Sequence, residues 1–116
     1  MPSIKAFFAK LYAARTYKKI QKWSSSPLET QNRVFQSLIS EAAATSFGVD
    51  HDFISINSHE DFVKRVPVRD YEALKPYVDK VVSGEANVLW KGKPLYFAKT
   101  SGTTSGAKYI PITKES

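Results

Sequence analysis

Cysteine is absent from this chain of 116 residues. The protein therefore forms no disulfide and uses no thiolate, and the absence is compatible with a reducing compartment. Long apolar runs are missing too, since none approaches the roughly 20 residues of a membrane-spanning helix. With 42% hydrophobic and 24% charged residues, the composition is that of a globular protein of about one domain. We expect a cytoplasmic protein without a membrane span.

Acidic residues are absent from residues 1–28, which carry six basic side chains: Lys5, Lys10, Arg15, Lys18, Lys19 and Lys22. Residues 29–116 carry eleven basic and eleven acidic side chains, so the net charge of +6 belongs entirely to the first segment. A charge confined to one segment argues against nucleic-acid binding by the whole chain.

The first segment has the hydrophobic spacing of an amphipathic helix over residues 3 to about 23. The simpler interpretation is a helix that packs on the domain with its lysines in water. A membrane-surface helix, a transit peptide and a nucleic-acid arm are the alternatives. A second helix is predicted to begin with Ser26 as N-cap, Pro27 as first residue and Glu29 as partner in a capping box. Gly48 is predicted to end it.

Two further helices are marked by their first and last residues. One opens at Ser58 and is ended by Pro67, because the residue before a proline is pushed out of helical geometry. The other is capped by Asp70 and closed by Gly84. Pro76 lies inside this last helix, where a proline is expected to kink or split it.

The pattern changes after residue 87 to short apolar runs. Residues 95–98 and 109–112 have the composition of strands on either side of a loop, which predicts a unit like a β-hairpin. We expect residues 1–84 to be mostly α-helical and residues 87–116 to form strand, loop and strand. Two strands alone are marginally stable in water, so we expect this chain to be the front part of a larger α/β protein.

The loop between the two strands has the most informative composition. It combines glycines, hydroxyl groups and a lysine: Thr100, Ser101, Gly102, Thr103, Thr104, Ser105, Gly106, Ala107 and Lys108. Glycines let backbone N–H groups approach an anion closely, hydroxyls add donors and lysine adds positive charge. The composition suits a phosphate site, and it suits equally a polar hairpin turn that uses glycine for positive φ.

The Walker A motif does not account for this loop. That motif has four residues between its glycines and then a lysine followed by serine or threonine. Here three residues separate Gly102 from Gly106, Lys108 comes one place late and Tyr109 follows it. Pro111 also argues against a helix after the loop. A phosphate would be held by backbone and hydroxyl groups between two strands.

Short motifs stand in one order along most of the chain. They are Thr30-Gln31, Phe47-Gly48, Asp61-Phe62, Val66-Pro67, Asp70-Tyr71-Glu72, Lys75-Pro76-Tyr77, Gly84-Glu85 and Ile110-Pro111-Ile112-Thr113. The loop itself is similar to the phosphate-binding loop of acyl-adenylate-forming enzymes. With the upstream motifs, the chain resembles the N-terminal part of the auxin-responsive Gretchen Hagen family, the acyl acid–amido synthetases, in a bacterial-type version.

The resemblance implies an α/β parent enzyme with a large N-terminal and a small C-terminal domain, of which residues 1–116 are the N-terminal part of the large adenylating domain. It implies a ligase that uses ATP and Mg²⁺ to adenylate a carboxylic acid and then transfers the acyl group to the amine of an amino acid. The family's adenine and ribose contacts, acidic magnesium ligand, acyl pocket and mobile C-terminal domain lie beyond residue 116. We therefore expect residues 1–116 alone not to be a competent ligase.

The resemblance also implies roles for the loop residues. The hydroxyls of Thr100, Ser101, Thr103 and Thr104 would donate to ATP phosphate oxygens, and one threonine would reach the magnesium ion. Gly102 and Gly106 would permit close backbone approach, and Ser105 lies in the same phosphate-binding stretch. Lys108 would add positive charge, or would be a solvated strand residue.

A non-catalytic alternative is a helical binding module that uses the basic first helix on an anionic surface. His51 lies between Asp50 and Asp52, but no second ligand pair at recognised spacing supports a metal site. We expect a loop histidine between solvated carboxylates and an exposed His59. Aromatic residues are expected in core or interface packing and not in base stacking: Trp23, Tyr71, Tyr77, Trp90, Tyr96 and Phe97.

Overall fold

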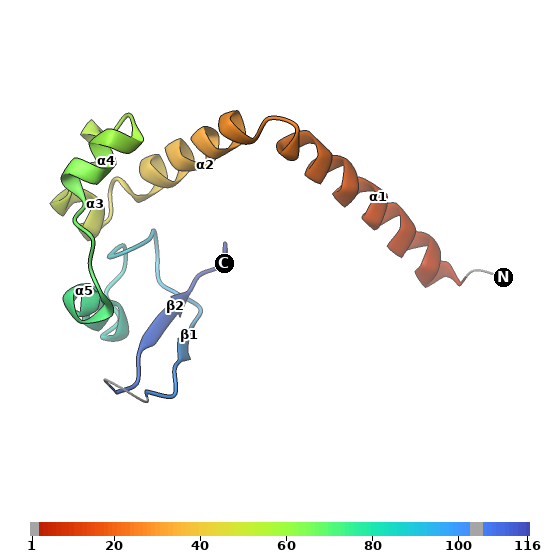
Figure 1. Cartoon of the computed structure of the whole chain (residues 1–116). Helices are drawn as coiled ribbons and strands as arrows, with labels where there is room; N and C mark the ends of the chain where they lie inside the picture. The colour runs from red at the N-terminus through yellow and green to blue at the C-terminus, as the bar shows by residue number, and fades with distance from the viewer. Residues whose placement is uncertain (1–2, 103–105) are drawn as a thin grey trace. The chain divides into compact units, whose positions relative to one another are not determined.

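The first helix, α1 (Ile4–Ser24; red in Figure 1), confirms the helix predicted over residues 3 to about 23. In the computed structural model, which describes residues 3–102 and 106–116, the chain forms two units, residues 1–36 and 37–116, and each is considered by itself. The Ser3 hydroxyl caps α1 by accepting a hydrogen bond from the Ala6 N–H at 3.3 Å. No residue of α1 is buried. Its predicted packing on the domain stays a prediction.

The second helix, α2 (Pro27–Ala42), begins at the predicted proline and carries Glu29 in its first turn. Its predicted end is wrong, because α2 ends at Ala42 and not at Gly48. The Ala42 carbonyl accepts hydrogen bonds from the N–H of Thr45 at 3.1 Å and from its hydroxyl at 2.7 Å. These two bonds turn the chain out of the helix before the glycine is reached.

Gly48 instead lies inside a short helix, α3 (Ser46–Asp50). The Thr45 hydroxyl caps α3 by accepting from the Gly48 N–H at 3.0 Å. A Cβ at position 48 would lie 2.0 Å from the Ala42 carbonyl oxygen. This glycine therefore marks close packing of α3 on the end of α2, and not a helix stop.

Three more helical elements follow. A 3₁₀ turn, η1 (Phe53–Ser55), leads to α4 (His59–Arg65) and then to α5 (Tyr71–Val82). Both longer helices begin at their predicted caps. The Ser58 hydroxyl accepts from the Asp61 N–H, and an Asp70 carboxylate oxygen accepts from the Ala73 N–H at 2.9 Å. As predicted, α4 ends just before Val66-Pro67.

The end of α5 is closed by the predicted glycine. Gly84 has a φ of 97°. Its N–H donates to the Val81 carbonyl, and the Glu85 N–H donates to the Lys80 carbonyl, both at 3.0 Å. This is the Schellman arrangement, in which a residue in the left-handed region satisfies the last carbonyls of a helix. Pro76 lies inside α5 without splitting it.

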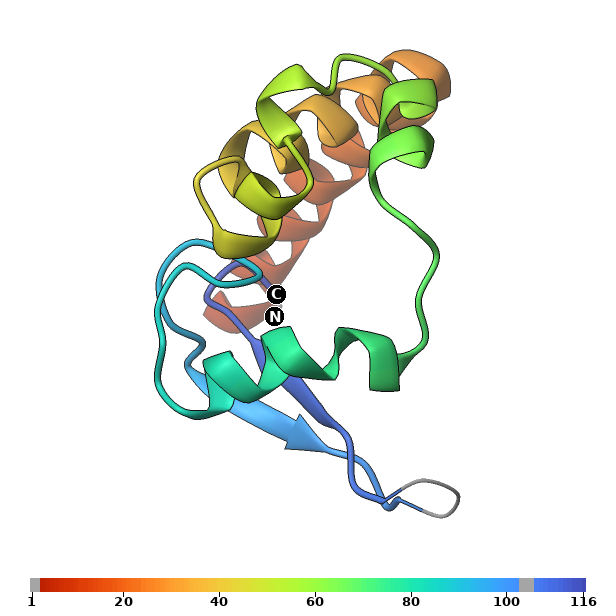
Figure 2. The same cartoon turned by 90° about the vertical axis from the view of Figure 1, so that its left-hand side faces the viewer.

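Two antiparallel strands complete the chain, β1 (Tyr96–Lys99) and β2 (Tyr109–Ile112). Figure 2 shows the hairpin with α5 lying across it, and α5 contacts β2. The mostly helical first part and the hairpin-like second part are thus confirmed for the described residues. The predicted division at residues 84 and 87 stays a prediction.

The register of the hairpin explains the position of Pro111. Thr100 and Lys108 stand directly opposite each other, and the Thr100 N–H donates to the Lys108 carbonyl at 3.0 Å. Hydrogen-bonded and non-hydrogen-bonded pairs alternate along an antiparallel ladder. The Lys99–Tyr109 and Phe97–Pro111 pairs are therefore non-hydrogen-bonded, and their backbone nitrogens point away from the partner strand. A proline, which has no N–H, fits such a position.

The core of the second unit is small. Its buried apolar residues are Ile39, Ala42, Phe53, Ile56, Val78, Val81 and Val88. The Phe47 ring joins them to α5, since its centroid lies 5.1 Å from that of Tyr77 in an edge-on contact. The backbone N–H of Phe47 donates to the Val88 carbonyl at 2.9 Å. The 87–88 segment thus satisfies a donor of the first turn of α3 that has no partner within the helix.

His51 differs from its prediction. It is buried, at 7% exposure, and is the C-cap of α3, whereas a loop histidine between solvated carboxylates was expected. Its Nδ1 lies 2.7 Å from the Phe47 carbonyl oxygen, and its ring stacks on the Phe47 ring at 4.0 Å between centroids. The histidine is buried because it satisfies a carbonyl at the end of α3 and packs on an aromatic ring. His59 is exposed, as predicted.

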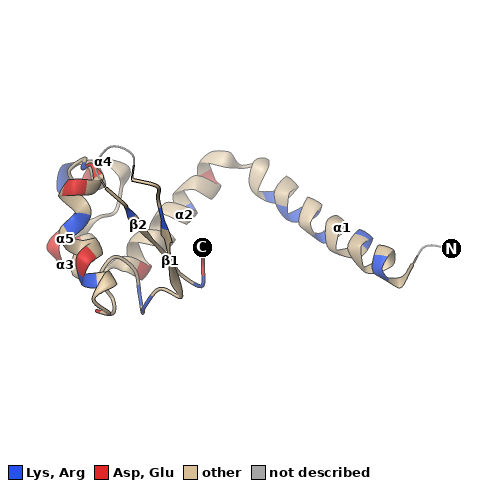
Figure 3. Cartoon of the chain, turned by 90° about the horizontal axis from the view of Figure 1, so that it is seen from below, with Lys and Arg blue, Asp and Glu red and all other residues tan. Residues whose placement is uncertain are grey.

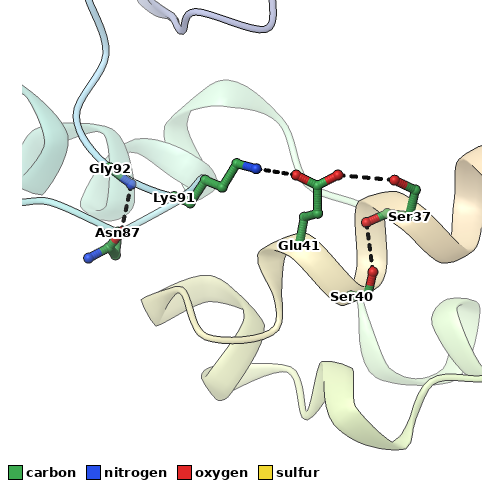
Figure 4. Close-up of polar contacts among 6 residues, drawn as sticks. All are labelled: Ser37, Ser40, Glu41, Asn87, Lys91 and Gly92. Carbon is green, nitrogen blue, oxygen red and sulfur yellow. Dashed lines mark hydrogen bonds and ion pairs between the residues drawn. The ribbon is translucent and has the colours of Figure 1, made fainter.

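An ion pair joins α2 to the turn that precedes the hairpin (Figure 4). The Lys91 amine pairs with Glu41, whose second carboxylate oxygen accepts from the Ser37 hydroxyl at 3.0 Å. The hydrogen bond from Lys91 lowers the pKa of the Glu41 carboxyl. The turn is shaped by Asn87, whose side-chain oxygen accepts from the Gly92 N–H at 2.6 Å.

Candidate functional site

The candidate phosphate loop connects β1 to β2 and so starts and ends at neighbouring positions of one hairpin. Thr100, Ser101, Gly102, Gly106 and Lys108 belong to the described residues. Thr103, Thr104 and Ser105, three of the predicted phosphate contacts, lie outside them. Ser101 is exposed.

The base of the loop is closed by two hydrogen bonds between Thr100 and Lys108. The Thr100 N–H donates to the Lys108 carbonyl, and the Lys108 N–H donates to the Thr100 hydroxyl oxygen, each at 3.0 Å. In a regular ladder the second bond would go to the Thr100 carbonyl. The side chain has taken the place of a backbone acceptor here. A hydroxyl that accepts one hydrogen bond still has its own O–H to donate, which suits the predicted role of Thr100.

Both loop glycines adopt backbone conformations that other residues avoid. Gly102 has a φ of 68° and Gly106 a φ of 83°. A Cβ on Gly102 would lie 2.5 Å from the Gly106 carbonyl carbon and 2.6 Å from the Ala107 nitrogen. A Cβ on Gly106 would meet nothing within 4 Å. Gly102 therefore lets the two arms of the loop pack on each other, and Gly106 provides an open backbone face.

Two lysines flank the loop, and each lies over an aromatic ring. The half-buried Lys108 has its amine 5.6 Å from the Tyr71 ring centroid. Lys99, the last residue of β1, has its amine 5.8 Å from the Tyr109 ring centroid. Cations held over ring faces gain from the negative face of the π system. Sequence reasoning named Lys108 and missed Lys99, whose only signal was its place directly before the loop.

Tyr71 is the other residue that sequence reasoning did not connect with the loop. It is the first residue of α5, and its hydroxyl accepts a hydrogen bond from the Tyr109 N–H at 2.9 Å. The sequence placed it in the Asp70-Tyr71-Glu72 motif and among the aromatic residues expected in core or interface packing. This bond to the first residue of β2 joins residues that are 38 positions apart.

Two absences concern the described part of the chain alone. Residues 3–102 and 106–116 hold no group of three histidine or acidic side chains placed to bind a metal. Within the same residues, no helix combines the length and the apolar character needed to cross a membrane.

Comparison with known proteins defines the class. Residues 16–116 match the model of the GH3 family N-terminal domain. A probable indole-3-acetic acid-amido synthetase of Oryza sativa subsp. japonica is 31% identical over 96 residues, which cover 71% of this chain and 20% of that protein. An indole-3-acetic acid-amido synthetase of Arabidopsis thaliana is 32% identical over 90 residues, covering 75% of this chain and 15% of the relative.

A third relative widens the range of acids. It is a 4-substituted benzoates-glutamate ligase of Arabidopsis thaliana, 29% identical over 92 residues, which cover 78% of this chain and 16% of that protein. Two of these relatives are thus named as acid-amido synthetases, and the third as a ligase of benzoates and glutamate. The chain belongs to the GH3 family, as the motifs predicted. These relatives are plant proteins, so they give no support to a bacterial-type version, and the chain spans about a fifth or less of their length.

Proposed function

We propose that this chain is the N-terminal part of the large adenylating domain of an ATP-dependent acyl acid–amido synthetase, and that residues 100–108 hold the phosphates of ATP. The observation that carries the proposal is the closed base of the loop, where Lys108 and Thr100 exchange two hydrogen bonds at 3.0 Å. That closure holds the hydroxyl of Thr100, the amine of Lys108 and the positive-φ glycines on one short segment. The parent fold is α/β, with a small C-terminal domain after the large one.

The reaction has two steps. A carboxylate oxygen of the acid attacks the α-phosphorus of ATP, the bond from that phosphorus to the bridging oxygen breaks, and pyrophosphate leaves. The amine nitrogen of an amino acid then attacks the acyl carbon of the adenylate, AMP leaves, and the amine loses a proton as the amide forms. Both steps depend on holding the phosphates in line and balancing their charge.

The loop residues divide this work by their chemistry. The hydroxyls of Thr100, Ser101, Thr103 and Thr104 donate to phosphate oxygens, and Ser105 lies beside them. Gly102 and Gly106 let backbone N–H groups approach, and Lys108 supplies positive charge. Mg²⁺, when bound with ATP, neutralises phosphate charge, and a threonine hydroxyl of the loop together with phosphate oxygens is the kind of oxygen ligand set it accepts.

Titration of the ¹⁵N-labelled chain tests the proposal. The probes are Mg·ATP, tripolyphosphate and adenosine, followed by amide chemical shifts. We expect Mg·ATP and tripolyphosphate to shift the amides of residues 100–109 and adenosine to leave them in place. Ser101→Ala should weaken the response, whereas Ser40→Ala, which removes an exposed hydroxyl bonded within α2, should not. Shifts confined to the lysines of α1 would contradict the proposal.

A second candidate function rests on α1. No residue of this helix is buried, and Figure 3 shows lysine and arginine along it without an acidic residue. Exposed apolar and basic side chains lie next to one another along α1: Phe8, Leu11, Tyr12, Ala14, Arg15 and Lys18. Aromatic residues beside cations suit the interface of an anionic lipid surface.

Vesicle binding tests this candidate. We expect the chain to co-sediment with vesicles that contain phosphatidylserine, to do so less at high salt, and to ignore phosphatidylcholine alone. Arg15→Glu with Lys18→Glu should abolish sedimentation, and Lys93→Glu with Lys114→Glu, at two exposed positions of the second unit, serves as the charge-matched control. Equal binding to both vesicle types, or none, rejects the lipid surface, and salt-sensitive binding to DNA alone would point to nucleic acid instead.

A further inference from the structure

Tyr71 stands where a helix meets the end of the candidate phosphate loop. It is the first residue of α5, and the Asp70 cap directly before it fixes the helix start through the bond to the Ala73 N–H at 2.9 Å. The Tyr71 side chain is half-buried. Its position is therefore set by α5 and not by the loop.

The hydroxyl of Tyr71 accepts a hydrogen bond from a backbone N–H of β2 that does not bond to β1. Because the Lys99–Tyr109 pair is non-hydrogen-bonded, the Tyr109 N–H points away from β1. The Tyr71 hydroxyl oxygen accepts this N–H at 2.9 Å. The bond ties the first residue of β2, directly after the loop, to the start of α5.

The ring of Tyr71 contacts Lys108, the residue directly before Tyr109. The Lys108 amine lies 5.6 Å from the ring centroid. Lys108 is also the residue whose backbone N–H and carbonyl close the loop on Thr100. One tyrosine therefore contacts the returning arm of the loop twice, through its hydroxyl to the backbone and through its ring to the cation.

We propose that Tyr71 is a positioning residue of the phosphate loop, with two separable actions. Its hydroxyl holds the backbone at Tyr109, which keeps Lys108 opposite Thr100, and its ring holds the Lys108 amine at the loop. This inference rests on the proposed function, because it assigns Tyr71 to the binding of ATP phosphates without placing it in contact with them.

Two substitutions separate the actions. Tyr71→Phe removes the hydroxyl and keeps the ring, whereas Tyr71→Leu removes both. We expect Tyr71→Phe to weaken binding of Mg·ATP by about 3- to 10-fold, the usual effect of one lost hydrogen bond. Tyr71→Leu should weaken it by about 2- to 5-fold more, through loss of the cation–π contact. Tyr77→Phe is the matched control, since it removes a tyrosine hydroxyl of the same helix that donates to Asp50 at 2.7 Å.

Spectroscopic signatures distinguish positioning from a general loss of structure. In the ¹⁵N spectrum, the Tyr109 amide should shift and exchange faster with solvent in Tyr71→Phe and Tyr71→Leu, and should stay unchanged in Tyr77→Phe. The ε-methylene protons of Lys108 should carry an upfield ring-current shift in the wild type and in Tyr71→Phe, and lose it in Tyr71→Leu. A purely structural role would move all variants of α5 alike.

A double-mutant cycle completes the test. In a Lys108→Met background the ring has no cation to hold, so Tyr71→Phe and Tyr71→Leu should bind Mg·ATP equally. If wild-type Mg·ATP binding leaves the loop amides unshifted, the proposed function fails and this inference with it. If the wild type binds through the loop and both Tyr71 variants bind as tightly as it does, the phosphate loop stands and the role of Tyr71 is refuted.

Discussion

Replacing Gly48 by alanine tests the packing of α3 on the end of α2. The test is whether the substitution raises or lowers the free energy of unfolding. Glycine inside a helix is ordinarily a weak residue, and alanine there stabilises by about 1 kcal/mol. Gly48 lies inside α3, so helix propensity alone predicts a more stable protein. The local packing predicts the reverse.

The magnitude follows from what the new methyl group would meet. A Cβ at position 48 would lie 2.0 Å from the Ala42 carbonyl oxygen, whereas ordinary contact begins at 3.4 Å. The carbonyl oxygen belongs to the backbone and the Cβ is bonded directly to it, so neither atom can rotate away and α3 must move from α2. That movement stretches the two bonds from Thr45 to Ala42, worth about 1 kcal/mol each, and overpacking adds about 1–3 kcal/mol. The better helix propensity of alanine offsets about 1 kcal/mol of this cost. The expected loss in the free energy of unfolding is therefore about 2–4 kcal/mol.

Urea unfolding followed by Trp90 fluorescence measures this loss in the second unit. Trp23 is replaced by phenylalanine in every variant, so that only Trp90 reports. Gly92→Ala is the control, because Gly92 has a φ of 75° and open space around it. It should cost about 1–2 kcal/mol for the left-handed backbone alone. A Gly48→Ala protein as stable as the wild type, or more stable, would refute the packing argument.

Three further predictions concern the loop, a helix cap and an ion pair. Gly102→Ala should destabilise the chain by about 1–3 kcal/mol more than Gly106→Ala does. Both glycines have positive φ, but only Gly102 has backbone atoms within 3 Å of the new Cβ. Equal unfolding midpoints of the two variants in urea would contradict this. Asp70→Ala should cost about 1 kcal/mol through the lost N-cap and reduce the helical circular dichroism signal; an unchanged signal and midpoint would speak against the cap. The hydrogen bond from Lys91 lowers the pKa of the Glu41 carboxyl in the folded protein. The stability that ionised Glu41 contributes is therefore fully present above the unfolded pKa of about 4.3. It is lost as the pH falls through the lower folded pKa. Unfolding midpoints between pH 6 and pH 3 should therefore fall less in Glu41→Gln than in the wild type, and parallel curves would exclude a role for the pair.

The helix starts were predictable because their causes are local. Ser58 and Asp70 each accept a hydrogen bond from a backbone N–H three residues later. A capping residue therefore predicts the start of its helix from only a few neighbouring positions. Gly84 closes α5 by the same kind of short-range bonding. The order of helices followed by a hairpin could be predicted for this reason.

The errors and omissions have tertiary causes. Gly48 has the sequence signature of a helix stop, yet its role depends on where the Ala42 carbonyl lies after the chain has turned. His51 stands between two acidic residues and is buried because it packs against Phe47. Tyr71 accepts a hydrogen bond from Tyr109, 38 positions later, a contact that no periodicity in the sequence predicts. For the loop itself, sequence identified the hydroxyls and glycines, whereas the exchange of bonds between Thr100 and Lys108 needed coordinates.

The outward-facing backbone nitrogens of β2 decide on which side of the hairpin a further strand could pair. Along the outer edge of β2, the Tyr109 N–H is already bonded to Tyr71, and Pro111 has no N–H to offer. A further strand at this edge could donate hydrogen bonds to the carbonyls of β2 but would receive none from the backbone nitrogens of Tyr109 and Pro111. Along the outer edge of β1, the nitrogens of Phe97 and Lys99 point outward and both carry hydrogens. The α5 side of the hairpin is thus a terminated edge, and β1 is the template on which further strands can be added.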